Sequence, residues 1–265
     1  MTNSRTLPSD PALTPDLGVG SDSRRGAHAA LEFHHAWSMA LQSGEALDER
    51  LPVSVLGEMS KCEFFYDFSS PFSYLGATQV ERITAGHELV WKPMLLGALF
   101  SSIGSPIVPL ATWPETKARH ALYDAYRWAD HWGVRFQWPK KFPQKTVTSL
   151  RAALAVEPAR IGAVSLGFFE AMWVHDQDLE DDTVVAAVLR ARGLDADAIL
   201  AETKTAVGKQ RLFATTEEAG RRGIPGAPAF IVDEQIFWGQ DRLHFVQKAL
   251  EGWRPKLPID LATPR

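Results

Sequence analysis

The sequence has 265 residues and one cysteine, Cys62. A single thiol cannot form a disulfide within the chain, a Cys-x-x-Cys redox pair or a zinc site built on several cysteines. The chain is therefore not expected to be a disulfide oxidoreductase. Cys62 stands at the start of an apolar strand pattern, and we expect a buried, inert thiol there. One cysteine is also compatible with a reducing compartment.

The chain also lacks a basic excess, since 28 Lys and Arg residues are balanced by 32 Asp and Glu residues. Nucleic acid is therefore not expected as a partner. No apolar run approaches the roughly 18 residues that cross a bilayer, and the segment after Arg24-Arg25 is too polar for a signal peptide. We expect a cytoplasmic protein that does not bind membranes. The histidine spacings do not form a metal site, so no metal is expected.

The most informative stretch that is present is Asp67-Phe68-Ser69-Ser70-Pro71-Phe72-Ser73-Tyr74-Leu75. The aromatic run before it, Phe64-Phe65-Tyr66, predicts a buried strand. Pro71 suits the first position of a helix, which makes Ser70 the N-cap. The Ser70 hydroxyl can bind a backbone N–H of its own helix or turn to a ligand at the positive helix end. Taken alone, this motif favours an ordinary helix cap.

A second informative stretch is the Gly/Pro turn at 223–228, which leads into an apolar strand. Pro228 at the strand entrance is a candidate for a cis peptide bond. Such a bond would leave the backbone groups of Ala227 free to pair with an extended ligand. Residues 235–238 predict another strand, and residues 239–242 lead into a helix. This part of the chain is therefore predicted to run strand, strand, helix.

Between Leu96 and about Phe213 the pattern predicts helices joined by Pro- and Gly-bearing loops. One helix opens at Trp113-Pro114-Glu115-Thr116 and ends near Gly133. The run Trp138-Pro139-Lys140-Lys141-Phe142-Pro143 cannot lie inside a helix, and we expect a rigid loop at the mouth of a site. Further helices are expected over 159–174, over 182–192 and after Gly193.

Together these segments resemble the 2-hydroxychromene-2-carboxylate isomerases and the kappa-class glutathione transferases. The resemblance covers residues 62 to about 252 and is carried by the following segments: 67–75, 117–132, 224–231 and 237–243. It implies an α/β protein with a thioredoxin-like fold and an all-helical insertion domain, assembled as a homodimer. The expected divisions are an N-terminal extension (1–58, disordered in its first part), a thioredoxin-like domain (59–96 and 214–255), the insertion (97–213) and a C-terminal tail (256–265).

The resemblance also implies that glutathione supplies the thiol that the chain lacks. Ser70 would donate a hydrogen bond to its sulfur, and Ala227 and Pro228 would hold its cysteinyl part. Asp241 would bind the γ-glutamyl ammonium, with Gln240 beside it. The expected function is a glutathione-dependent isomerase that adds thiolate reversibly to a small conjugated or aromatic-derived carboxylate. The alternatives are a kappa-like transferase that conjugates electrophiles and a non-catalytic thioredoxin-fold protein that binds thiol peptides or a partner.

The substrate side of this expected site departs from the family pattern. On the helix that carries Lys117 and Arg127, we expect Lys117 to point into the site as a cationic ligand contact, for instance to a substrate carboxylate. Ser105 stands where family members often carry an asparagine, and His120 stands where a tyrosine is usual. We expect both to contact substrate, although a packed or surface histidine is the simpler interpretation of His120. The segment after Phe142-Pro143 also lacks an asparagine that the family pattern leads us to expect. These departures favour a substrate other than a hydroxychromene carboxylate.

Overall fold

The fold is taken from a computed structural model, in which residues 59–256 are described. The expected N-terminal extension (1–58) and all but the first residue of the expected C-terminal tail (256–265) lie outside the described residues. A four-stranded sheet occupies the centre, with the strands in the order β2-β1-β3-β4. The strands are β1 (Lys61–Tyr66), β2 (Glu88–Pro93), β3 (Ala229–Val232) and β4 (Gln235–Trp238).

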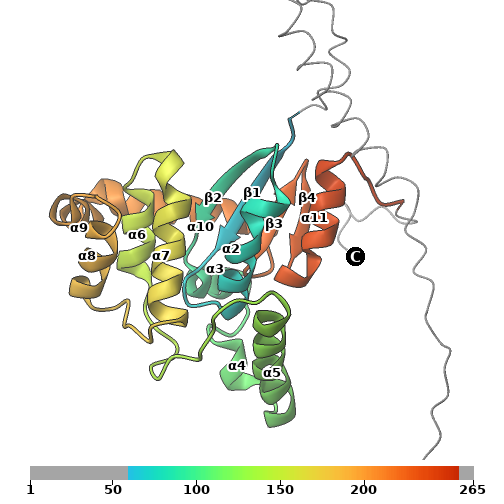
Figure 1. Cartoon of the computed structure of the whole chain (residues 1–265), viewed down its shortest axis with the longest axis horizontal. Coiled ribbons are helices and arrows are strands. Elements are labelled where there is room, and N and C mark those ends of the chain that lie inside the picture. The colour runs from blue at the N-terminus through green and yellow to red at the C-terminus, as the bar shows by residue number, and fades with distance from the viewer. Residues whose placement is uncertain (1–58, 257–265) are drawn as a thin grey trace, which may run out of the picture. The chain divides into compact units, whose positions relative to one another are not determined.

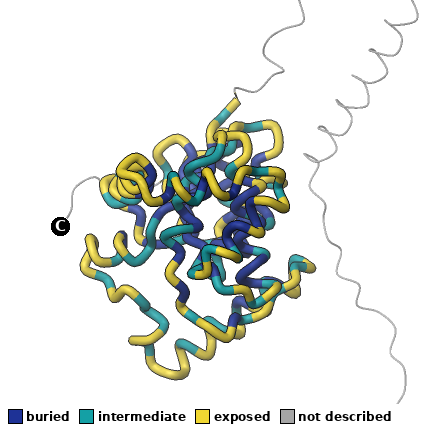
Figure 2. Tube along the Cα trace, turned by 90° about the vertical axis from the view of Figure 1, so that its left-hand side faces the viewer, coloured by how far each residue is buried: buried dark blue, intermediate teal, exposed yellow. Residues whose placement is uncertain are grey.

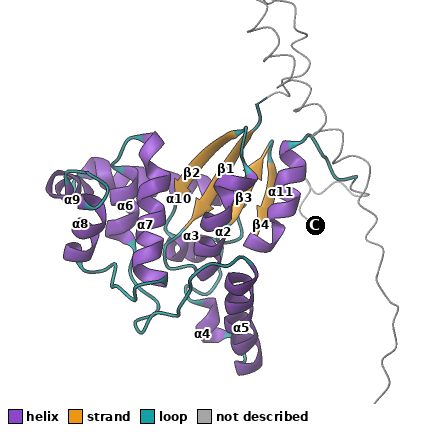
Figure 3. Ribbon diagram, viewed as in Figure 1, coloured by secondary structure: helices purple, strands orange, loops and turns teal. Residues whose placement is uncertain are grey.

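The sheet joins two parts of the chain that are far apart in sequence (Figure 3). Strands β1 and β2 are parallel and are connected by helix α2 (Pro71–Ile83). Strand β3 pairs antiparallel with β1, and β4 pairs antiparallel with β3. Helix α11 (Leu243–Leu250) follows β4 after a short 3-10 turn (Gln240–Arg242). The predicted strand and helix on either side of Ser70, the predicted strand, strand, helix order after Pro228 and the thioredoxin-like arrangement are confirmed.

The two faces of the sheet bury two separate groups of side chains, because successive residues of a strand point to opposite faces. Phe64 and Tyr66 of β1 belong to the larger core, to which α2 and α11 contribute. Phe65 belongs to a smaller core on the other face, with residues of α3 (Leu96–Ser102) and α10 (Ala206–Arg221). Within residues 59–256, buried residues fill the centre and exposed residues follow the loops (Figure 2).

The remaining helices stand between β2 and α10 in the chain. Helices α6 to α9 pack with α10 beside the sheet, whereas α4 and α5 lie apart from that group, and α5 contacts α2 (Figure 1). The expected helices near 115–133, 159–174, 182–192 and after Gly193 are confirmed. None of the helices within residues 59–256 is long and apolar enough to span a membrane. The bounds are α4 Pro109–Thr112, α5 Glu115–His131, α6 Val147–Leu154, α7 Ile161–Trp173, α8 Asp182–Arg190 and α9 Ala196–Lys204.

Helix α7 fixes the end of β1 through two buried hydrogen bonds. The Tyr66 hydroxyl and Ser165 Oγ lie 2.5 Å apart, and Trp173 Nε1 donates to the Phe68 carbonyl oxygen at 2.8 Å. Phe68 also packs edge-on against Phe169, with ring centroids 4.9 Å apart. The loop that leads from β1 into α2 is therefore held by the helical part of the chain.

Candidate functional site

Ser70 is the N-cap of α2, as the sequence predicts. Its backbone is extended, with φ −99° and ψ 116°, and its Oγ accepts a hydrogen bond from Ser73 N at 3.1 Å. The same hydroxyl donates to the Ala227 carbonyl oxygen at 3.3 Å. In capping the helix, Ser70 Oγ therefore acts as a hydrogen-bond acceptor. Its hydroxyl proton remains directed at the turn that contains Ala227. A ligand that competes for this proton would meet the positive end of the α2 dipole.

The turn that faces Ser70 contains a cis peptide bond between Ala227 and Pro228. Gly239 N donates to the Pro228 carbonyl oxygen at 2.9 Å, which ties the turn to the end of β4. Helix α2 packs closely at Gly76, where an added Cβ would lie 3.2 Å from Phe230 Cζ and 3.6 Å from Pro228 Cγ. The start of α2, the Pro228 turn and the end of β4 thus meet at one place.

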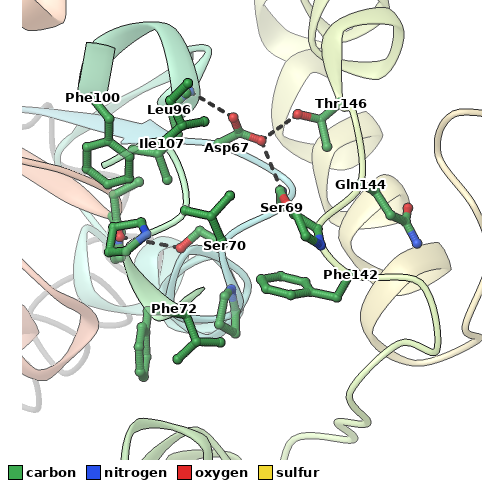
Figure 4. A pocket seen from close by; sticks show the side chains of 18 of the residues that line it. Asp67, Ser69, Ser70, Phe72, Leu96, Phe100, Ile107, Phe142, Gln144 and Thr146 are labelled. Atoms are coloured by element: carbon green, nitrogen blue, oxygen red, sulfur yellow. Dashed lines mark hydrogen bonds between the residues drawn. The ribbon is translucent and has the colours of Figure 1, made fainter. Parts of the chain in front are cut away.

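A cavity of about 700 Å³ opens at this meeting point. Ser70, Ala227, Pro228, Gln240 and Asp241 all line it, so the structure brings five of the eight predicted site residues together. Its size lies within the range of small-molecule sites. Much of the remaining wall is apolar (Figure 4), and its aliphatic and aromatic side chains include Phe72, Leu96, Phe100, Ile107, Leu110, Trp113, Trp138 and Phe142.

The acidic end of the cavity follows β4. Gly239 has φ 106°, a conformation that side chains rarely adopt, and an added Cβ would collide with the Asp241 carboxylate. Gln240 is buried, whereas Asp241 is partly exposed and forms an ion pair with Arg242. A carboxylate that is exposed to the cavity is suited to an ammonium group of a ligand.

The other three predicted residues lie outside the set that lines the cavity. Lys117 is exposed, and its Nζ stands 4.2 Å from the centroid of the Trp113 ring. His120 is exposed on the same helix. Ser105 is half-buried, and its backbone N–H donates to the Phe100 carbonyl oxygen at 2.8 Å. Their binding roles stay predictions.

Asp67 is a cavity residue to which the sequence analysis assigned no role. Its side chain is 2% exposed and accepts three hydrogen bonds. Oδ1 accepts from Thr146 Oγ1 at 2.6 Å and from Ser69 N at 3.0 Å, and Oδ2 accepts from Leu96 N at 2.9 Å (Figure 4). Burial raises the pKa of this carboxyl above its ordinary value, although all three hydrogen bonds favour the charged form. The position of Asp67 before Ser69-Ser70-Pro71 indicates an aspartate in a turn. No residue near Asp67 or Thr146 in the sequence indicates the contact between the two.

Cys62 is buried in β1 and does not line the cavity. Burial, with a smaller effect from the neighbouring Glu63, raises the pKa of its thiol to about 12. We expect the native protein to resist an aromatic disulfide reagent at pH 8, because the thiolate is the reactive form. One equivalent of thiol should react after unfolding in guanidinium. Rapid labelling of the folded protein would contradict this expectation.

Comparison with known proteins shows the family to which the chain belongs. The model of the DSBA-like thioredoxin domain matches residues 61–251, and the chain belongs to this family. The 2-hydroxychromene-2-carboxylate isomerase of Sphingobium xenophagum is 27% identical over 199 residues, which cover 71% of this chain and 96% of that protein. Glutathione S-transferase kappa 2 of Caenorhabditis elegans is 26% identical over 202 residues, covering 68% of this chain and 87% of that protein.

A solved structure of a 2-hydroxychromene-2-carboxylate isomerase shares the fold. It matches with a TM-score of 0.65 at 22% sequence identity, over 72% of this chain and 95% of the solved chain. The resemblance and the fold class expected from the sequence are thereby confirmed. The chain is related to isomerase and glutathione transferase enzymes.

Proposed function

We propose that the protein is a glutathione-dependent isomerase of the 2-hydroxychromene-2-carboxylate isomerase type, acting on a small conjugated or aromatic-derived carboxylate. The observation that carries the proposal is the position of the Ser70 hydroxyl, which caps α2 and faces the Ala227 carbonyl at a largely apolar cavity. The chain's own thiol lies elsewhere, in β1. A thiol-dependent reaction at Ser70 therefore requires a thiol from a ligand.

The residues at the cavity fit glutathione in chemical type. When bound, glutathione would supply a thiolate that adds reversibly to a conjugated substrate and leaves again after bond rotation. Ser70 would donate a hydrogen bond from its hydroxyl to the sulfur, and the N-terminus of α2 would favour the negative charge. Ala227 would offer backbone groups to the cysteinyl portion of the ligand. Asp241 would hold the γ-glutamyl ammonium, and the apolar wall would limit the access of water.

We expect the Asp241→Asn variant to bind glutathione about tenfold more weakly, because a charge-assisted hydrogen bond to the ammonium is lost. Calorimetric titration of glutathione into the wild type and the variant measures this change. Glu251→Gln removes an exposed carboxylate just after α11, outside the cavity, and serves as the control. Equal affinities for wild type and Asp241→Asn would remove Asp241 from the site. Absence of binding to the wild type would disprove the proposed cofactor.

The kappa-class relatives favour a transferase as the second candidate, since both chemistries use the same nucleophile. Glutathione stoichiometry distinguishes them. An isomerase converts many equivalents of a conjugated carboxylate with a small amount of glutathione, whereas a transferase consumes one glutathione for each product. Tight glutathione binding without turnover of any conjugated substrate or electrophile would instead support a non-catalytic binding protein.

The proposal includes the assembly and location that the family resemblance implies, a homodimer in the cytoplasm. Light scattering of the purified chain tests the assembly, and a monomeric mass across micromolar concentrations would contradict it. Cell fractionation tests the location.

A further inference from the structure

The charges around the cavity are mainly negative. Within residues 59–256, its lining includes four carboxylates, Asp67, Asp124, Glu180 and Asp241, and two basic side chains, Lys145 and Arg242. A substrate carboxylate that enters this cavity would be repelled unless a cation compensates. The available cation therefore decides whether an anionic substrate is accepted.

Arg242 is already engaged, because its guanidinium forms an ion pair with Asp241. Glu180 is likewise paired, with Lys141 Nζ at 3.1 Å from its Oε1. Lys145 differs from these groups, since its ammonium forms no ion pair within 4.0 Å with a carboxylate of residues 59–256. Its backbone hydrogen bond and, to a smaller extent, its charge lower the pKa of the neighbouring Glu180 carboxyl. Lys145 is exposed and lines the cavity. Lys145 is thus the cation that can meet an incoming anion without first breaking another pair.

The backbone around Lys145 is anchored on both sides. Its own N–H donates to Glu180 Oε1 at 2.9 Å. The following residue, Thr146, donates to Asp67 Oδ1 at 2.6 Å, and the preceding Gln144 accepts from Leu179 N at 2.8 Å. The side chain of Lys145 therefore extends from a fixed point of the cavity wall.

We propose that Lys145 binds the carboxylate of the substrate and sets the preference for anionic over neutral substrates. This inference rests on the proposed function. Thr146 donates to the Asp67 carboxylate (Figure 4), and Ser70 N donates to the Asp67 carbonyl oxygen at 3.1 Å. A thiolate at Ser70 and a carboxylate at Lys145 would therefore hold a conjugated substrate along the apolar wall near Phe142. Lys117, the cation favoured by the sequence, does not itself line the cavity, and its ammonium lies 4.2 Å from the centroid of the Trp113 ring, which does line it.

Benzylidenepyruvate and benzylideneacetone provide a matched pair of probes. They share the phenyl ring and the conjugated ketone. The ketone carries a carboxylate in benzylidenepyruvate and a methyl group in benzylideneacetone. In both, glutathione adds across the carbon–carbon double bond, with sulfur to the β-carbon and a proton to the α-carbon. For Lys145→Gln we expect KM for benzylidenepyruvate to rise roughly tenfold. KM for benzylideneacetone should stay within about twofold of the wild type.

The control is Lys140→Gln, which removes the same charge from the same loop. Lys140 lies outside the cavity lining, and its Nζ pairs with Asp176 at 3.3 Å. The Lys140→Gln variant should leave KM for both probes unchanged. An equal change in KM for both probes in Lys145→Gln would overturn the inference. So would a selective rise in KM in Lys117→Gln with no change in Lys145→Gln.

Calorimetric titration of benzylidenepyruvate without glutathione separates this inference from the proposed function. Weaker binding to Lys145→Gln than to the wild type supports Lys145 as the carboxylate contact, even if glutathione itself fails to bind. Equal binding to both proteins, or no binding to either, overturns the role of Lys145 whatever the result with glutathione.

Discussion

Replacement of Ser70 by alanine is expected to lower kcat/KM for a glutathione-dependent reaction by roughly 100-fold, the scale of losing one hydrogen-bond donor to a reacting anion. The variant keeps the α2 dipole and the Pro228 turn but loses the hydroxyl that faces Ala227. Less of the bound thiol would then be ionised at neutral pH. Initial rates and the ultraviolet absorbance of thiolate in the glutathione complex measure the two effects.

The Ser70→Ala variant also removes a helix cap, which costs about 1 kcal/mol of stability. Thr205→Ala is the matched control, because Thr205 Oγ1 caps α10 by accepting from Gly208 N at 3.1 Å and lies outside the cavity lining. It should show a similar loss of stability with unchanged kcat/KM. If both variants lose activity equally, Ser70 acts as a cap alone and the thiol-activating role is wrong.

The parts of the site that the sequence predicted rest on local chemistry. Ser70 and Pro71 are neighbours, and together they define the start of α2 without information from elsewhere in the chain. Pro228 similarly marks the entrance of β3, and its cis bond agrees with the turn predicted there. Sheet pairing then brings both turns together, because β3 lies directly beside β1. Continuous runs of aromatic and apolar residues are enough to predict these two strands.

The orientation of the helical residues at the site was harder to predict. Spacing along α5 allows only one of Lys117 and Arg127 to turn inward, and Lys117 is the one expected to do so. In the structure, neither lines the cavity, and each lies near an aromatic ring of its own region, Trp113 and Tyr123. Helical periodicity gives the angle between two side chains on one helix. It does not say which side of the helix faces the rest of the protein. That side depends on how α5 packs against α2, which involves residues distant in sequence.

The contacts of Asp67 show the same limit. Its bond to Ser69 is local, but Leu96 lies 29 residues away and Thr146 lies 79 residues away. This carboxylate therefore links the β1–α2 loop, the start of α3 and the start of α6. No sequence pattern indicates such a three-way contact, because each donor is an ordinary backbone or hydroxyl group.

Replacement of Asp67 by alanine is expected to lower the free energy of unfolding by about 3 kcal/mol, because three buried donors lose their acceptor. Denaturant unfolding measures this loss. Asp67→Asn should cost less, since its amide oxygen can still accept, although its amide nitrogen must face a donor. Asp130→Asn, which changes an exposed carboxylate of α5, is the control and should alter stability by less than about 0.5 kcal/mol.

The pH dependence of stability tests the charge of Asp67 separately from its packing. Because burial raises the pKa of Asp67 in the folded state, the folded protein binds more protons than the unfolded chain between the ordinary and the raised pKa. Its contribution to stability must then decrease as the pH rises through that interval. Asp67→Asn cannot titrate and should remove this decrease, whereas Asp130→Asn should retain it. An unchanged slope in Asp67→Asn would mean that the three hydrogen bonds outweigh burial and keep Asp67 ionised throughout.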